Sequence, residues 1–248
     1  MSNTEAHPAE RVCANEPPPP GAAPAGTPPL EMLPPREVPL GGPRAMGVRR
    51  VLPQRERSLV GAWCFLDSYG PEDVAAGGMR VARHPHTGLA TVSWLFEGRI
   101  DHLDSAGNWA TVRPGEVHLM NAGAGITHQE FSTADTGVLH GVQLWYAFPD
   151  RARFSEPSLA SHRPEPVLGP GYAALVFAGT LLGASSPIRT HLPLTGADLR
   201  LEPGARLDAR GSRRAAPAGI DRPVMADQPP WPIGHVRPTV VDRPTAVH

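Results

Sequence analysis

Four potential metal ligands occur in two pairs, and the members of each pair are two residues apart. His84 and His86 form the first pair, and His128 and Glu130 form the second. Side chains two apart on a β-strand point to the same face. Two such pairs on neighbouring strands would bring three imidazoles and one carboxylate together. That donor set suits a first-row transition metal such as iron, copper, nickel, manganese or zinc.

The segment between the two pairs predicts antiparallel β-structure. Residues 89–96 are rich in β-forming side chains, and 99–103 alternate between apolar and polar residues. Turns that contain Gly or Pro separate the expected strands, at Glu97-Gly98, Asp104–Asn108, Arg113–Glu116 and Asn121–Gly125. Short strands with turn signals at this spacing are typical of a small barrel or jelly roll.

An ordered series of sequence motifs resembles the metal-binding half of the pirins, a two-domain family of the cupin superfamily. The motifs are Phe65-Leu66-Asp67, His84-Pro85-His86-Thr87-Gly88, Leu95-Phe96-Glu97-Gly98, Asp104-Ser105-Ala106-Gly107-Asn108, Pro114-Gly115-Glu116-Val117 and Gly125-Ile126-Thr127-His128-Gln129-Glu130. The resemblance covers roughly residues 38–150. It implies an all-β cupin fold, a double-stranded β-helix or jelly-roll barrel, in a bicupin whose second domain is incomplete.

The resemblance also implies which residues bind the metal. The pirin ligands fall on His84, His86, His128 and Glu130. Glu97 matches a ligand position of many other cupins, but in the pirin pattern it lies at a turn and is not expected to bind. Three further histidines lie in expected strands, and one of them could donate a hydrogen bond to a ligand; they are His102, His118 and His140. One departure from the family pattern is Ala124, where pirins commonly carry Arg.

Two functions are consistent with the resemblance. The first is a quercetin 2,3-dioxygenase-type reaction at one divalent metal, with Fe²⁺ preferred and Cu, Ni, Mn or Zn as alternatives. A flavonol-like substrate and O₂ would react there, and Glu130 would serve as a ligand and as the base that takes the 3-hydroxyl proton. The alternative is a non-catalytic, iron-dependent regulatory partner of a transcription factor or metabolic enzyme. Fold-level kinship does not choose between them.

The chain is expected to divide into four parts. Residues 1–37 are Pro-rich without apolar periodicity and predict a disordered tail, and 38–150 form the metal-binding cupin domain. A linker and partial second cupin domain occupy 151–207, and 208–248 read as a disordered Arg- and Pro-rich tail. We expect a frameshift or truncation near residue 208, with a natural divergent tail as the alternative. Apolar strands at 175–177 and 199–201 would then lack partners.

Composition limits the classes of partner. The chain has 23 basic and 24 acidic residues, with a formal net charge of −1. This balance provides no positive field for direct nucleic-acid binding. No apolar run is long enough for a transmembrane helix, so no membrane interaction is expected. The start of the chain lacks the pattern of a signal peptide, and two cysteines do not make a disulfide framework. A cytoplasmic location is the simplest setting.

Overall fold

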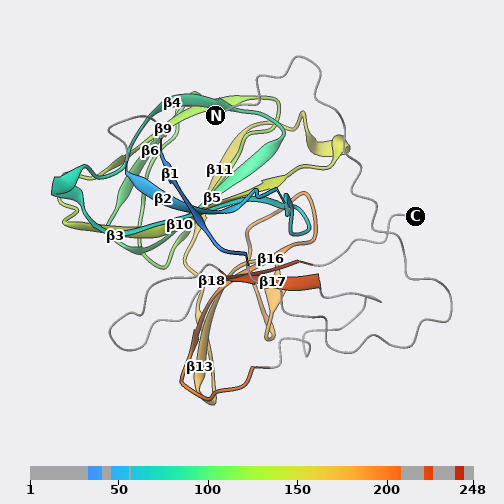
Figure 1. The fold of residues 1–248 in the computed structure, drawn as a ribbon. Coiled ribbons are helices and arrows are strands. Elements are labelled where there is room, and N and C mark those ends of the chain that lie inside the picture. The colour runs from blue at the N-terminus through green and yellow to red at the C-terminus, as the bar shows by residue number, and fades with distance from the viewer. Residues whose placement is uncertain (1–32, 41–45, 56, 208–220, 226–237, 243–248) are drawn as a thin grey trace.

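The computed structural model describes residues 33–40, 46–55, 57–207, 221–225 and 238–242. Its first part contains eleven strands and two short 3-10 helices (Figure 1). These are β1 (Arg36–Pro39), β2 (Gly47–Leu52), β3 (Trp63–Asp73), η1 (Val74–Ala76), β4 (Arg80–His86), β5 (Leu89–Glu97), β6 (Ile100–Asp104), β7 (Trp109–Val112), β8 (Val117–Asn121), β9 (Ile126–Ser132), β10 (Val138–Ala147), η2 (Asp150–Ala152) and β11 (Ser158–His162). No helix among the described residues is long and apolar enough to cross a lipid bilayer.

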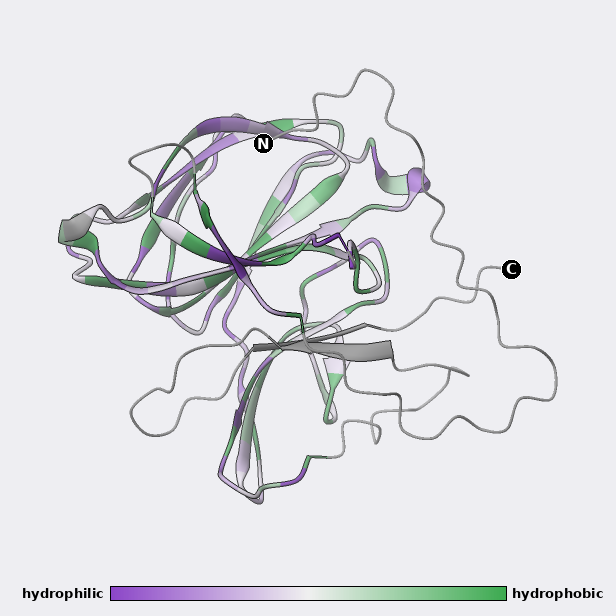
Figure 2. Ribbon diagram, viewed as in Figure 1, coloured by the Kyte–Doolittle hydropathy of each residue, from purple (hydrophilic) through white to green (hydrophobic). Residues whose placement is uncertain are grey.

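Two antiparallel sheets make up this first part. Seven strands pair in the order β1-β2-β3-β10-β5-β8-β11, and four pair in the order β4-β9-β6-β7. The smaller sheet carries the predicted ligand pairs, and its strand β4 is mostly hydrophilic along its length (Figure 2). The all-β prediction is therefore confirmed, and the turns fall close to the expected positions.

The turn after β5 shows why a glycine is required there. Gly98 has a φ of 82°, in the left-handed region that favours glycine. A Cβ atom added at this position would lie 2.4 Å from the Val138 carbonyl oxygen. The close approach lets β5 end at Glu97 and the chain enter the smaller sheet at β6 without a longer loop.

The later part of the chain forms a second body. Its strands are β12 (Pro166–Gly169), β13 (Tyr172–Ala178), β14 (Thr180–Leu181), β15 (Ala184–Ser185), β16 (Thr195–Leu201), β17 (Asp221–Met225) and β18 (Pro238–Asp242). Five of them pair in the order β12-β13-β16-β18-β17, and β14 pairs with β15. Strands β17 and β18 lie within residues 208–248, which were expected to form a tail. The other residues of that segment fall outside the described part of the chain, as do residues 1–32 of the expected N-terminal tail.

The expectation that residues 175–177 and 199–201 lack partners is wrong. Leu175 pairs with Asp198, and Leu199 pairs with Ala174, because β13 and β16 are antiparallel neighbours. The side chain of Phe177 is 1% exposed. Pairing between strands distant in sequence was not apparent from the apolar pattern of either strand alone.

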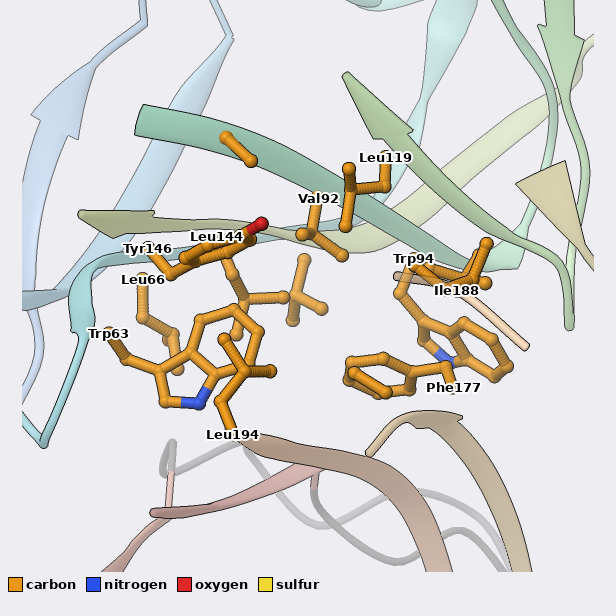
Figure 3. Packing of buried hydrophobic residues seen from close by; sticks show 14 of the residues in the cluster. Trp63, Leu66, Val92, Trp94, Leu119, Leu144, Tyr146, Phe177, Ile188 and Leu194 are labelled. Atoms are coloured by element: carbon orange, nitrogen blue, oxygen red, sulfur yellow. The ribbon is translucent and has the colours of Figure 1, made fainter. Parts of the chain in front are cut away.

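The main hydrophobic cluster lies between the seven-stranded sheet and this second body. Outward-facing side chains of the sheet, including Trp94 and Leu144, join Phe177, Ile188 and Leu194 from the later part of the chain (Figure 3). The rings of Trp94 and Phe177 are stacked with centroids 5.0 Å apart, and Trp94 Nε1 donates to Asp198 Oδ2 at 3.3 Å. The second body therefore covers the sheet face that points away from the smaller sheet.

The opposite face of the same sheet carries a row of polar residues. Cross-strand partners follow one another from β2 to β11 in the order Arg50, Asp67, Gln143, Ser93, His118 and Ser161. Residues directly opposite one another in a sheet share a face. The row therefore faces the smaller sheet, which carries the predicted ligands.

An ion pair stabilises the β2–β3 end of this row. Arg50 donates from Nε and Nη2 to the two carboxylate oxygens of Asp67, at 2.8 and 2.7 Å. Burial raises the pKa of Asp67, and the hydrogen bonds and charge of Arg50 oppose that effect. The Asp67 side chain is 1% exposed and that of Arg50 is 21% exposed. Because water does not reach the Asp67 carboxylate, Arg50 supplies its hydrogen bonds.

We predict that Arg50→Leu destabilises the fold by roughly 3 kcal/mol, because it leaves a buried carboxylate without a partner. Arg99→Leu is the matched control, since it breaks the ion pair of Arg99 with Asp135, whose side chains are 52% and 64% exposed. The control should cost less than about 1 kcal/mol. Urea unfolding of both variants measures the difference. Equal losses would show that Arg50 contributes no more than a surface ion pair.

Candidate metal centre

The predicted ligands lie on the adjacent strands β4 and β9. His84 is directly opposite His128 in the register of these strands. Burial on β9 alternates, with His128 and Glu130 buried and Thr127 and Gln129 less so. On β4, His86 is buried and His84 is half-buried. The spacing argument therefore holds, since the members of each pair point to the same side of the smaller sheet.

All four residues line one cavity between the two sheets, with a volume of about 50 Å³. The rest of its wall comes from Leu40, Val48, Phe65, Asp67, Tyr69, Met79, Val81, Gln143 and Trp145. A cavity needs at least about 10–15 Å³ to hold one water molecule, so this cavity is large enough for ordered water. With the space that opens to solvent included, the hollow measures about 420 Å³.

The histidine nitrogens converge in this cavity. His84 Nε2 and His128 Nε2 are 3.1 Å apart. Two nitrogens bound at about 2.1 Å on adjacent corners of an octahedron lie about 3.0 Å apart, so this spacing fits two ligands of one ion. His86 Nε2 is buried and has no hydrogen-bond partner. The ligand nitrogens of these three histidines all lie within 4.8 Å of one another.

The tautomer of His84 follows from its backbone contact. His84 Nδ1 is 2.9 Å from the carbonyl oxygen of Ala82. A carbonyl oxygen only accepts, so Nδ1 carries the hydrogen and the neutral ring has its lone pair on Nε2. That lone pair points toward His128 Nε2.

Burial keeps these imidazoles neutral. It lowers the pKa of His86 to about 4, with a smaller contribution from the charge of His84. Burial also lowers the pKa of His128 to about 2, and the neighbouring histidines add to the effect. Only the neutral ring binds a metal, so the histidines are ready to bind at neutral pH without losing a proton.

Glu130 belongs to a second group of potential ligands that shares His128 with the first. Its carboxylate lies within 4.8 Å of the ligand nitrogens of His102 and His128. Ser93 Oγ, on the facing sheet, donates to Glu130 Oε1 at 3.4 Å. Burial raises the pKa of Glu130 to about 7, and the Ser93 hydrogen bond partly opposes it.

His102 is a residue whose position the spacing argument did not find. It is directly opposite Glu130 in the pairing of β6 with β9, and Asp104 is opposite His128. His102 and Asp104 are also two residues apart, as in the other pairs, but the sequence from Asp104 to Asn108 predicts a hairpin loop in place of a strand. His118 and His140 lie elsewhere: the His118 ring contacts His102 at 4.8 Å, and the His140 ring packs on Phe96 at 4.5 Å.

A stack of planar side chains leads from the polar row to the first ligand pair. The Arg50 guanidinium lies 4.4 Å from the centre of the Phe65 ring. Phe65 and Trp145 are stacked with centroids 4.0 Å apart. Trp145 meets the His86 ring in an edge contact at 4.8 Å. The orientation of His86 is therefore supported by packing from the facing sheet.

Comparisons with known proteins agree with these motifs. Residues 45–146 match the sequence profile of the family described as Pirin. A pirin-like protein of Caulobacter vibrioides is 39% identical over 181 residues, which cover 68% of this chain and 63% of that protein. This chain belongs to the pirin family. A Pseudomonas aeruginosa protein, provisionally named as a quercetin 2,3-dioxygenase, is 41% identical over 172 residues, 68% of this chain and 54% of that protein.

Solved structures show the same relationship. The crystal structure of quercetin 2,3-dioxygenase from Acinetobacter baumannii aligns with a TM-score of 0.65 at 38% identity, over 68% of this chain and 56% of that one. The expected cupin fold is confirmed by this match. The chain spans between about half and two thirds of the length of these relatives.

His118 gives a prediction about acid stability. Burial lowers the pKa of His118 to about 3, from the ordinary histidine value of about 6.5. As the pH falls, this histidine is therefore protonated in the unfolded chain before it is protonated in the folded protein. Between about pH 6.5 and pH 3 the ring is protonated in the unfolded chain and neutral in the folded protein. The free energy of unfolding therefore falls by about 1.4 kcal/mol for each pH unit as the pH decreases through this range. In the unchanged protein, His118 Nδ1 lies 3.0 Å from Ser161 Oγ. The His118→Asn variant replaces the imidazole with a side chain that does not titrate and that still offers Ser161 a polar partner.

We therefore expect the variant to lose less stability than the unchanged protein between pH 7 and pH 5. Urea unfolding of both proteins at several pH values gives the two slopes. Parallel slopes would mean that His118 takes up its proton as readily in the folded protein as in the unfolded chain, contrary to its burial.

Proposed function

We propose that this pirin binds one divalent transition-metal ion through His84, His86, His128 and Glu130. The observation that carries the proposal is the 3.1 Å approach of His84 Nε2 to His128 Nε2, with the His84 lone pair directed at the gap. The unpartnered Nε2 of His86 supports it. Glu130 is included because it faces the same way as His128 on β9 and lines the same cavity.

The donor set suits Fe²⁺, and Cu, Ni, Mn and Zn accept the same ligands. We propose that the reaction is a quercetin 2,3-dioxygenase-type cleavage of a flavonol by O₂, in line with the names of the relatives. When bound, the metal supplies Lewis-acid and redox chemistry for substrate and O₂.

The chain's own residues would position the substrate and move its proton. Glu130 is buried and lines the cavity, so its carboxylate can accept the proton of a flavonol 3-hydroxyl. The Ser93 hydroxyl contacts that carboxylate at 3.4 Å and Gln143 Oε1 at 2.9 Å. The rings of Phe65 and Trp145 form an apolar wall of the cavity that a flavonol-like substrate can contact.

One observation favours a second candidate function. Small-molecule sites usually have volumes of about 300–1,000 Å³, whereas the cavity measures about 50 Å³. A flavonol would have to occupy the part of the hollow that is open to solvent. A metal-dependent regulatory partner of another protein needs no such space, and it remains the alternative.

The metal assignment predicts the stoichiometry of variants. The purified protein should contain about one ion per chain after incubation with Fe²⁺ under anaerobic conditions, and His84→Ala and His128→Ala should each lose most of it. His162→Ala is the control, since His162 lies on β11 away from the cavity wall. Elemental analysis after gel filtration measures the content. Full occupancy in both site variants would reject the ligand set.

The enzymatic proposal predicts O₂ uptake when quercetin is added to the iron-loaded protein. Glu130→Gln should lower the rate by about 100-fold or more, because the amide cannot accept the substrate proton. An oxygen electrode gives the rate, and the metal content of each sample is measured in parallel. Stoichiometric iron with no quercetin-dependent uptake would support the regulatory alternative over the enzyme.

A further inference from the structure

We propose that His102 and Asp104 are positioning residues that hold His128 in its metal-binding tautomer. This inference rests on the proposed metal site. It assigns a role to the Asp104–Asn108 hairpin, which joins β6 to β7 and lines no part of the cavity described above.

The hairpin holds Asp104 as an acceptor of hydrogen bonds. Its Oδ1 accepts from the backbone N–H groups of Ala106 and Asn108, at 2.9 and 3.0 Å. Its Oδ2 accepts from Asn108 Nδ2 at 2.8 Å. A carboxyl group that receives three N–H donors is held as the carboxylate, which has no hydrogen to donate.

The carboxylate determines the tautomer of His102. Asp104 Oδ2 is 3.3 Å from His102 Nε2, and both side chains are buried. Because Oδ2 can only accept, Nε2 of His102 carries the hydrogen. In the neutral ring, the lone pair is then on Nδ1.

His102 in turn determines the tautomer of His128. The two Nδ1 atoms are 3.4 Å apart. With a lone pair on His102 Nδ1, the hydrogen of this contact must come from His128 Nδ1. The lone pair of His128 is therefore on Nε2, the atom that faces His84 Nε2.

Two lone pairs thus face each other across 3.1 Å, one set by the Ala82 carbonyl and the other by Asp104 through His102. Neither nitrogen has a hydrogen to share with the other, so the contact is repulsive until a cation is bound to both. A hydrogen bond from the second nitrogen of a ligating histidine to a carboxylate or other acceptor is how proteins orient metal ligands. Here His102 is placed between the ligand and the carboxylate.

The strand register makes this chain of contacts possible. His102 and Asp104 are two residues apart on β6, and they lie opposite Glu130 and His128 on β9. The hairpin that follows β6 therefore fixes Asp104 on the same face of the sheet as the ligands. His102 could instead be a ligand itself, since it groups with His128 and Glu130, and the experiment separates the two roles.

The test uses Co²⁺ as the probe, with affinity measured by competition against a chromophoric chelator and coordination followed by the visible absorption of the bound ion. His102→Phe removes the acceptor and should weaken Co²⁺ binding by about 10–100-fold. His102→Asn places a carbonyl oxygen near the position of Nδ1 and should restore affinity to within a few-fold, with an unchanged spectrum. His102→Gln reaches toward Asp104 in place of His128, and it should bind as weakly as the Phe variant.

His118→Asn makes the same substitution at a neighbouring buried histidine. It measures how much a buried His-to-Asn change by itself affects the affinity for Co²⁺. If the unchanged protein fails to bind Co²⁺, the proposed metal site itself is wrong. If it binds and His102→Phe binds equally well, the positioning role is rejected while the site stands. Weak binding by His102→Asn with an altered spectrum would make His102 a ligand, which also overturns the inference. Should His102→Phe not fold, the Asn and Gln variants decide the question alone.

Discussion

The pairing of β4 with β9 is the constraint on which the site depends. It places His84 directly opposite His128, and each strand carries its second proposed ligand two residues further along the same face. A slip of one residue in this register would turn every ligand of one strand to the other face of the sheet. The third strand, β6, adds His102 and Asp104 at the same spacing. Three neighbouring strands thus direct polar pairs toward the seven-stranded sheet.

The seven-stranded sheet separates two different environments. Its outward face packs on Phe177, Ile188 and Leu194 from the later part of the chain, which excludes water from that side. Its inward face presents the polar row from Arg50 to Ser161, and Ser93 of that row donates to Glu130. The buried polar groups of the site therefore have partners on both sheets, which reduces the cost of enclosing them.

The sequence alone was sufficient to predict the β-structure and the family, and to place the two pairs of proposed ligands each on one face of a strand. These depend on local signals: alternation along a strand, glycine at turns, and motif order. It was not sufficient to single out His102 from His118 and His140, because the contact of His102 with His128 depends on the register of β6 against β9. Nor did it find the partners of Leu175 and Leu199, since residues 179–194 separate β13 from β16 and no local pattern shows which strands pair.

The central claim is that one metal ion binds where the lone pairs of His84 and His128 meet. Anomalous diffraction from crystals loaded with Fe²⁺ or Co²⁺, collected on both sides of the metal's absorption edge, tests it most directly. We predict a single strong peak between the Nε2 atoms of His84, His86 and His128, with the Glu130 carboxylate in contact. A peak bound by His102 in place of His84, or no peak in this cavity at full metal loading, would contradict the account.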